Sequence, residues 1–462
     1  MNITFLGATQ QVTGSCHLLQ VGNLRILLDC GLQQGGDDSH EQNHADFLFE
    51  PSSIDAVILS HAHLDHSGRL PLLVDKGFRG PIYAHPATID LCAILLEDAA
   101  YLNERGAFWE NRKRQRKGME LVEPLYTRTQ ARRCLEHFQA IEYHSEKQIF
   151  NDVKVTMHDA GHILGSCIVG LKLTEQNTHK TVIYSGDLGH ANAPILNDPA
   201  ILTEADLVIM ESTYGDRLHR SWEDTWNELG DIFTRAHSDK GNILIPAFTV
   251  GRTQEILYCF NRYYKEWGLE NWNIFLDSPM AIETTKVYSK YSSLYSPGEH
   301  KNLTKYGNTF SLPNLRFTAS TEESMALNRV QSGAIIIAGS GMCNGGRIKH
   351  HLKHNLWRHQ SHIIIVGFQA RSTPGRALVD GAQWLSLWGE DIKVNAHIHT
   401  PGGLSAHADQ QGLINWYKNF THKPKLVLVH GEAEYQSVLR EELKQQLGIN
   451  AIIAKHKQTI EL

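Results

Sequence analysis

The chain contains the segment Ser60-His61-Ala62-His63-Leu64-Asp65-His66-Ser67-Gly68, which follows directly after an apolar run at residues 56–59. The length and branched side chains of that run predict a buried strand. Four side chains able to bind a metal fall within six residues, with the spacing H-x-H-x-D-H. A turn that leaves a strand can direct alternate residues into one pocket and the next pair into an adjacent one, which suits two metal ions. We therefore predict a metal site, with a surface cluster of histidines as the alternative.

Three further candidate ligands each follow a predicted strand and stand near a glycine: His162, Asp187 and His430. A single His or Asp in such a place is more often a turn residue. Three of them favour a metal site because the H-x-H-x-D-H segment needs partners and glycine lets the backbone approach closely. Tetrahedral coordination then gives two sets of ligands bridged by Asp187: His61, His63 and His162 in the first, and Asp65, His66 and His430 in the second. Imidazole with carboxylate and no thiolate favours two Zn²⁺ ions, with Mn²⁺ or Fe²⁺ as substitutes.

The composition is that of a globular protein. At about 150 residues per domain, 462 residues predict about two to four domains. A net charge of -6, with 41% hydrophobic and 20% charged residues, excludes a disordered chain and a generic basic coat for nucleic acid. The sequence shows neither an apolar run of roughly 18 residues nor a secretory signal at its start. Seven scattered cysteines form no C-x-x-C pair, so we expect a cytoplasmic protein without membrane association.

Short apolar runs that end in polar or glycine-bearing turns recur along the chain, and several are followed by helical patterns. This succession predicts an α/β fold. Residues 16–21 and 24–28 flank Gly22-Asn23 and predict an antiparallel hairpin. Residues 90–137 have a helical pattern that contains the basic run 112–117. Such a run is more often a solvated helix face than part of a track for RNA.

The order Asp29, H-x-H-x-D-H, His162 and Asp187 resembles the motif series of the metallo-β-lactamase superfamily. Three later segments resemble motifs A, B and C of its β-CASP group: LVIMESTYG at 207–215, SAHAD at 405–409 and VHGE at 429–432. Further segments at 246–255, 339–342 and 367–376 are similar to the same group. The resemblance covers nearly the whole chain. It is nearest to bacterial and archaeal relatives of the endonuclease subunit of the cleavage and polyadenylation specificity factor.

The resemblance implies an αββα metallo-β-lactamase fold interrupted by an α/β β-CASP domain, with the active site in the cleft between the two. The lactamase domain would comprise residues 1–211 and, as a C-terminal part, residues 396–462. The β-CASP domain would comprise residues 212–395. The resemblance also leaves a homodimer open.

Hydrolysis of an RNA phosphodiester bond needs an activated water, which two metal ions supply, and a proton for the leaving oxygen, which they do not. That proton requires a group with a pKa near 7, and His407 in motif B is the candidate general acid. Asp65, Asp187 and Glu211 are counted with it as catalytic residues. Asp29 and Glu211 resemble positions that accept the free N–H of ligand imidazoles, although turn capping is the alternative for Asp29.

Candidate substrate contacts lie in the later part of the chain. Ser340 and Gly341 belong to a glycine-rich segment, 339–347, that follows a predicted strand and opens a helix. Amides in such a place can hold a phosphate, although a plain tight turn explains the segment equally well. Guanidinium groups bind phosphate in a bidentate manner, and His399 is a further candidate contact. The arginines concerned are Arg347, Arg371 and Arg376.

The sequence thus predicts a zinc-dependent ribonuclease that acts on single-stranded RNA, as an endonuclease and with 5′-exonuclease activity left open. By the resemblance, His430 at motif C indicates RNA, because relatives that act on DNA tend to have Val there. One alternative is a small-molecule thioester or lactam hydrolase of the same superfamily, for which an insertion of this size has no evident use. The other is a non-catalytic RNA-binding scaffold, but such paralogues lose metal ligands and all the predicted ligands are present here.

Overall fold

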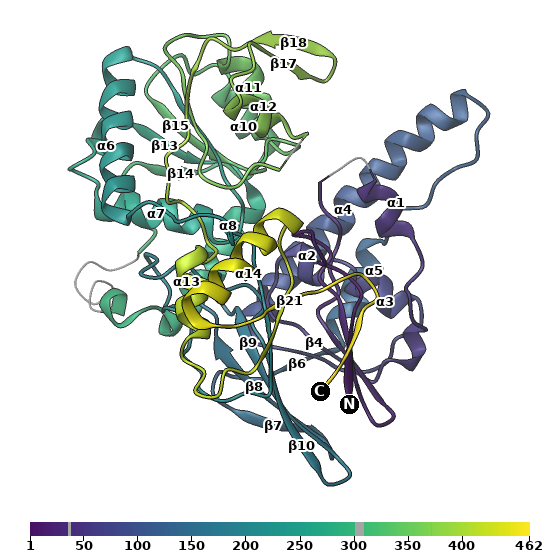
Figure 1. Cartoon of the computed structure of the whole chain (residues 1–462). Coiled ribbons are helices and arrows are strands. Elements are labelled where there is room, and N and C mark those ends of the chain that lie inside the picture. Colours follow the sequence, from purple (N-terminus) through teal and green to yellow (C-terminus); the bar gives the residue numbers. More distant parts are fainter. Residues whose placement is uncertain (36–37, 301–308, 371) are drawn as a thin grey trace. The chain divides into compact units, whose positions relative to one another are not determined.

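The computed structural model of the protein describes residues 1–35, 38–300, 309–370 and 372–462 (Figure 1). Over these ranges the chain forms two compact units. Unit 1 consists of Met1–Ala193, Asn197–Leu218 and His407–Leu462, and unit 2 consists of Pro194–Leu196 and His219–Ala406. The chain therefore leaves unit 1, builds most of unit 2 and returns to unit 1, as expected for an inserted domain.

Unit 1 contains two mixed sheets in its described part. The first has the strand order β22-β1-β2-β3-β4-β5-β6 and the second β21-β20-β11-β10-β9-β8-β7. The first consists of β1 (Asn2–Phe5), β2 (His17–Val21), β3 (Leu24–Leu28), β4 (Ala56–Ile58), β5 (Ile82–Ala84), β6 (Phe138–Ala140) and β22 (Thr459–Glu461). The second consists of β7 (Glu146–Phe150), β8 (Val153–Asp159), β9 (Cys167–Glu175), β10 (Thr178–Tyr184), β11 (Leu207–Met210), β20 (Lys425–Leu428) and β21 (Ile452–Ile453). Phe5 and Ile58 from one sheet share a buried cluster with Val169 and Val427 from the other, so the two sheets face each other.

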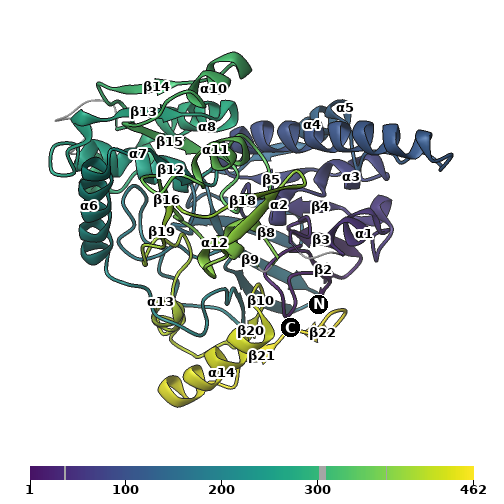
Figure 2. The ribbon, with the colours of Figure 1, turned by 90° about the horizontal axis from the view of Figure 1, so that it is seen from above.

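Helices cover the outer faces of these sheets. Leu413 of α13 (Gln410–Tyr417) and Leu439 of α14 (Ala433–Leu447) pack against Val208 on the outer face of the second sheet. On the first sheet, Leu27 and Val57 alternate with the residues of the shared core and are still buried, so the opposite face is also covered. Figure 2 shows helices beside this sheet. They are α2 (Leu64–Ser67), α3 (Leu70–Asp75), α4 (Pro86–Arg116) and α5 (Arg128–Leu135), with α1 (Ser39–His44) and the 3₁₀ turn Pro51–Ser53 nearby in the sequence. The predicted αββα layers are confirmed.

The N-terminal hairpin is also confirmed, because β2 and β3 pair in antiparallel register on either side of Gly22-Asn23. The strands nearest the two chain ends pair with each other as well: β1 lies antiparallel to β22, with Ile3 opposite Ile460. The two termini accordingly lie side by side in Figure 1. Among the described helices, the search for an apolar stretch long enough to cross a membrane finds no candidate.

Unit 2 is built on a parallel sheet with the order β14-β13-β15-β12-β16-β19. Its central strands are continuous apolar runs; all five residues of Ala334–Ala338 are buried, which is typical of a parallel sheet covered on both faces. The strands are β12 (Ile243–Pro246), β13 (Asn273–Leu276), β14 (Leu315–Phe317), β15 (Ala334–Ala338), β16 (His362–Ile364) and β19 (His397–His399), with a separate hairpin β17 (Trp384–Leu387) and β18 (Glu390–Lys393). The helices are α6 (Trp222–Asp239), α7 (Arg252–Arg262), α8 (Pro279–Lys290), α10 (Thr321–Leu327), α11 (Ile348–Asn355) and α12 (Pro374–Val379), with 3₁₀ turns Leu269–Asn271 and Ser292–Leu294.

The limits of unit 2 differ from the predicted limits of the β-CASP domain, residues 212 and 395. The unit extends to Ala406 because β19 pairs in parallel with β16 and so belongs to its sheet. At the other limit, residues up to Leu218 stay with unit 1, where Tyr214 forms a β-bridge with Asp409. The division into family domains stays a prediction.

A buried carboxylate, Asp277, lies at the end of β13 in unit 2. Its Oδ1 accepts hydrogen bonds from Arg347 Nη1 and Thr318 Oγ1, both at 2.7 Å. Its Oδ2 accepts from Ser324 Oγ and His351 Nε2, both at 2.6 Å. Burial alone would raise the pKa of Asp277, but the hydrogen bonds from His351, Ser324 and Thr318 outweigh it and lower this pKa to about 2.

We predict that Asp277→Ala lowers the free energy of unfolding by about 3–5 kcal/mol, because it leaves Arg347 without its ionic partner and the buried ring of His351 without its hydrogen-bond partner. Urea unfolding followed by circular dichroism measures the change. The exposed Asp391 of β18 provides the control, and Asp391→Ala should stay within about 0.5 kcal/mol of the parent chain. The contribution of Asp277 should be complete above its ordinary pKa of 3.8 and should be lost as the pH falls from there towards 2. Equal acid sensitivity of the parent and Asp277→Ala chains would contradict this.

Candidate metal centre in unit 1

The turn after β4 carries the H-x-H-x-D-H segment. His61 and His63 precede α2, and Asp65 and His66 lie inside this short helix. A side chain at Gly31 would place its Cβ 1.6 Å from the carbonyl oxygen of Asp65. Only glycine therefore lets the chain that follows β3 pack against this turn.

Two further candidate ligands lie in turns of the second sheet, His162 after β8 and Asp187 after β10. The two turns meet at glycines: Gly189 N donates to Ala160 O at 2.7 Å, and a Cβ on Gly189 would lie 2.0 Å from Gly161 O. The expectation that glycines beside the candidate ligands permit close approach of the backbone is confirmed here.

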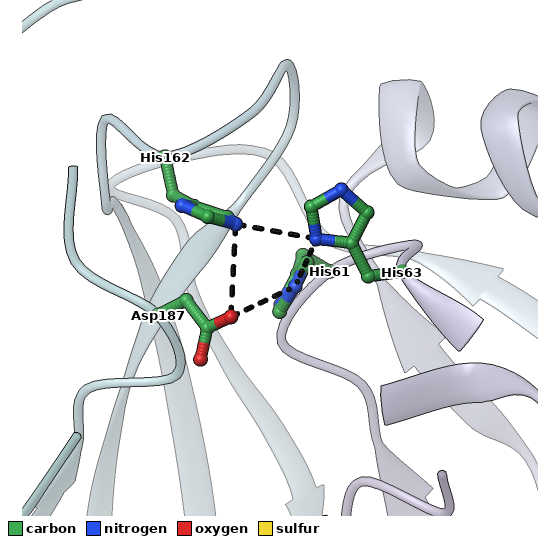
Figure 3. Close-up of side chains that lie close together, drawn as sticks. All are labelled: His61, His63, His162 and Asp187. Carbon is green, nitrogen blue, oxygen red and sulfur yellow. Dashed lines mark hydrogen bonds and ion pairs between the residues drawn. The ribbon is translucent and has the colours of Figure 1, made fainter. Parts of the chain in front are cut away.

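The first group of potential ligands consists of His61, His63, His162 and Asp187, whose ligand atoms all lie within 4.8 Å of one another (Figure 3). His63 Nδ1 lies 3.1 Å from His61 Nε2 and 3.2 Å from His162 Nε2. Asp187 Oδ2 lies 3.4 Å from His61 Nε2 and 3.6 Å from His162 Nε2. Three imidazoles and one carboxylate oxygen thus converge on one point.

The second group consists of Asp65, His66 and His430, again with ligand atoms within 4.8 Å of one another. His66 Nε2 lies 3.2 Å from His430 Nε2, which lies 3.5 Å from Asp65 Oδ2. Asp187 Oδ1 lies 3.3 Å from His66 Nε2. The carboxylate of Asp187 therefore faces the first group with one oxygen and the second group with the other.

These distances fit a metal. In a tetrahedral zinc site with bonds of about 2.0–2.1 Å, neighbouring ligand atoms are about 3.3 Å apart. The contacts within the first group, 3.1–3.6 Å, bracket this value. Asp187 Oδ1 is buried and has no hydrogen bond in the structure, which is costly for a carboxylate oxygen unless a cation binds it. The donor set, imidazole and carboxylate, is one that zinc accepts.

The protonation states of the group also suit metal binding. Burial lowers the pKa of His61 well below its ordinary value and that of His63 to about 4, so both imidazoles are neutral. Burial would raise the pKa of Asp187, but its interactions with His430 and His66 lower this pKa well below its ordinary value. Neutral imidazole and ionised carboxylate are the forms that bind metals.

Asp29 lies behind His66, on the side away from the ligand atom. Its Oδ2 lies 2.6 Å from His66 Nδ1 and accepts hydrogen bonds from Tyr184 Oη at 2.6 Å and Ser60 Oγ at 2.7 Å. Its Oδ1 accepts from Ser60 N at 2.7 Å. Asp29 adopts a left-handed backbone conformation, φ 60°, which is costly for a residue with a side chain. The contact between Asp29 Oδ2 and His66 Nδ1 fixes the ring of His66 so that its Nε2 faces the other ligands of the second group.

Glu211 contacts His407, whereas the family resemblance predicts that it supports a ligand imidazole. His407 Nδ1 lies 3.0 Å from Glu211 Oε1 and 3.2 Å from Oε2. Glu211 is held in place because Leu188 N donates to Oε1 at 2.7 Å and Thr213 N to Oε2 at 3.2 Å. Burial would lower the pKa of His407, but the charge of Glu211 raises it to about 9, above the near-neutral value expected. His407 Nδ1 lies 4.0 Å from Asp187 Oδ2.

The predicted phosphate-binding arginines belong to unit 2. The guanidinium of Arg347 donates to Asp277, to Thr318 O and to Ala319 O, so the structure gives it partners within the protein. Arg376 forms two hydrogen bonds with Asp380. Arg371 lies outside the described residues. Contacts of these arginines with a substrate stay predictions.

The other predicted substrate contacts also lie in unit 2. Ser340 and Gly341 follow β15; Gly345 N donates to Ser340 Oγ at 3.2 Å, and Gly341 O accepts from Gln369 Nε2 at 2.9 Å. These bonds are those of a closed turn. His399 lies on β19, with Nε2 2.9 Å from His362 Nδ1. Their contacts with substrate likewise stay predictions.

Two residues near the ligands were not singled out from the sequence. Tyr184, whose hydroxyl group contacts Asp29, is the last residue of β10. Thr213 Oγ1 lies 3.0 Å from His430 Nδ1. Both stand within three residues of a predicted site residue, and that closeness in the sequence was the available signal.

Known families match nearly the whole chain. The metallo-beta-lactamase superfamily domain matches residues 18–214, the Beta-Casp domain residues 253–378, and the Zn-dependent metallo-hydrolase RNA specificity domain residues 391–454. The chain belongs to the β-CASP group of the metallo-β-lactamase superfamily. This β-CASP protein is therefore a metal-binding hydrolase by family, and its candidate ligands lie in the matched regions at 18–214 and 391–454.

Individual relatives of this β-CASP protein support the assignment. It is 39% identical over 434 residues to ribonuclease TTHA0252 of Thermus thermophilus, with 94% of each chain covered. It is 30% identical over 474 residues to the transcription termination factor FttA of Methanocaldococcus jannaschii, covering 98% of this chain and 72% of that factor. A protein of unknown function from Enterococcus faecalis, solved by crystallography, superimposes with a TM-score of 0.54 at 14% identity and covers 100% of this chain and 99% of its own; this likeness shows the fold alone.

We predict that Asp29→Asn weakens zinc binding by about 10–100-fold without removing a ligand, because an amide no longer supplies the charge that fixes the His66 ring. Competition with a zinc chelator measures the affinity. Asp75→Asn, at an exposed carboxylate on α3, serves as the control and should bind zinc like the parent chain. Equal affinity of all three proteins would show that Asp29 only caps its turn.

Proposed function

We propose that the chain is a zinc-dependent ribonuclease that hydrolyses phosphodiester bonds of single-stranded RNA at two Zn²⁺ ions, mainly as an endonuclease. The observation that carries the proposal is the position of Asp187, whose two oxygens face separate groups of ligands while His407 lies 4.0 Å from one of them. Two ions held by these residues would supply an activated water and neutralise charge, and His407 beside them would supply the proton for the leaving oxygen.

His61, His63, His162 and Asp187 would hold one ion, and Asp65, His66, His430 and Asp187 the other. Such ions, when bound, lower the pKa of a water and neutralise charge on a phosphoryl group. The seven side chains together would fix the positions of the ions and shield them, since five of the seven are more than nine-tenths buried and the other two, His63 and Asp65, are partly buried. A 5′-exonuclease activity and a homodimer stay predictions, as does a cytoplasmic location.

His407 would act as the general acid. Both oxygens of Glu211 lie within 3.2 Å of His407 Nδ1, so the Nδ1 proton is donated to that carboxylate and the ring is held in one orientation. The Nε2–H then remains as the donor for the leaving oxygen of the cleaved phosphodiester. The side chain of His407 is 19% exposed, whereas that of Glu211 is fully buried, so the acid is accessible while the residue that orients it is not.

The choice of RNA is supported by two comparisons. The RNA specificity domain matches residues 391–454, a range that contains both His407 and His430. The relative from Thermus thermophilus, of which 94% is covered by this chain, is named a ribonuclease. The thioester or lactam hydrolase considered from the sequence has no comparable support.

We predict that His407→Ala keeps the zinc content of the parent chain and loses about 10²–10⁴-fold in cleavage rate, because it removes the proton donor and leaves every proposed ligand in place. Labelled single-stranded RNA is incubated with each protein, zinc is measured by elemental analysis, and sequencing of the product ends separates endonuclease from exonuclease cleavage. Cleavage at the parental rate by His407→Ala would disprove the assignment of the acid.

We predict that Asp65→Ala, in contrast, loses one zinc ion and nearly all cleavage, since it removes a ligand of the second group. The same elemental analysis and RNA assay compare it with Asp75→Ala, an exposed carboxylate in the same unit. A thioester assayed in parallel tests the alternative substrate. Turnover of the thioester without RNA cleavage by the zinc-loaded parent would reject the proposed function.

A further inference from the structure

A separate group of potential metal ligands lies in unit 2 and shares no residue with the centre in unit 1. Ligand atoms of Asp239, His362 and His397 all lie within 4.8 Å of one another. The group uses neither the family motifs nor the residues assigned above to catalysis. Its composition, two imidazoles and one carboxylate, is that of a zinc site with a position left for water.

The group follows from the register of the sheet. In the parallel pair of β16 and β19, His362 stands opposite His397, so both rings project from the same face, with centroids 4.8 Å apart. Asp239 is the last residue of α6, and its Oδ2 lies 3.1 Å from His362 Nε2. This distance is close to the separation of about 3.3 Å expected for two ligands of one tetrahedral zinc ion.

A third histidine supports His362 from the other side. His362 Nδ1 lies 2.9 Å from His399 Nε2, and the two rings are parallel within 1°. If His362 Nε2 binds an ion, its proton must reside on Nδ1, where it is donated to His399 Nε2. This contact would hold the His362 ring in one orientation, with Nε2 free for the ion.

The group is reachable from solvent yet anchored. His362 is fully buried, whereas Asp239 and His397 are exposed. An ion from solution can therefore reach two exposed ligands and one buried ligand that is fixed by its neighbours.

We propose that Asp239, His362 and His397 bind a divalent cation of the zinc type, with His399 fixing the tautomer and orientation of His362. The ion would join the end of α6 to β19, the strand at the edge of the sheet. β19 is also the last strand of unit 2 before the chain returns to unit 1 at His407. The site is additional to the two ions proposed for unit 1 and does not depend on their function.

The test counts ions on the full-length protein. Parent, His397→Ala and Asp239→Asn chains are stripped with a chelator, equilibrated with zinc chloride and examined by native mass spectrometry. Both substituted residues are exposed, so folding is retained, and circular dichroism checks it. The expected result is one zinc ion fewer on each variant than on the parent, together with a smaller rise in melting temperature on adding zinc.

The control is His422→Ala, an exposed histidine of unit 1 outside every group of ligands found in the described residues. It should keep the ion number of the parent. Equal ion numbers on the parent, His397→Ala and Asp239→Asn would overturn the proposal. Loss of an ion from His422→Ala as well would also overturn it, because binding would then be non-specific. Failure of the RNA assay would leave this count unchanged, so the two proposals can fail separately.

Discussion

The arrangement of unit 1 depends on one constraint: the charge of the buried Asp187 carboxylate must be compensated by positive charge. Its two oxygens are buried between imidazoles that arrive from three different parts of the chain, and one oxygen has no hydrogen bond within the described structure. An ionised carboxylate in such surroundings is tolerable only beside positive charge. The two facing sheets, the glycine contacts between turns and the late return of the chain to unit 1 all bring ligands to this one group.

Three histidines of the site each contact a buried side chain that fixes the orientation of the imidazole ring. Asp29, which accepts a hydrogen bond from Tyr184, contacts His66; Thr213 contacts His430, and Glu211 contacts His407. These groups cost free energy to bury, and each is hydrogen-bonded at the ends of strands, where the sheets fix the backbone. The positions of the imidazoles are therefore fixed by the ends of the strands as well as by the turns that carry them.

Features of the site that depend on neighbouring residues could be predicted from the sequence. Features that depend on side chains meeting from distant parts of the chain could not. The H-x-H-x-D-H spacing and the glycines beside His162 and Asp187 predict candidate ligands that the structure brings together. They could be recognised because the spacing and the glycines are each features of a single turn. The partners of Glu211 and Arg347 were not foreseen, because each is chosen by residues more than 20 positions away. Unit 2 runs beyond residue 395, the predicted end of the β-CASP domain, and only the pairing of β19 with β16 reveals this. The cluster at Asp239 escaped notice for the same reason, its members being scattered over three elements.

The discontinuity of unit 1 has a consequence for biosynthesis. While a ribosome is still translating unit 2, the nascent chain already contains His61 and Asp187 but neither His407 nor His430, and β1 lacks its neighbour β22. Contacts between residues so distant in the chain form late, after the intervening unit has folded. A translation product interrupted within unit 2 lacks both the proposed acid and one proposed ligand, so we expect it to leave RNA intact, including the messenger that encodes it.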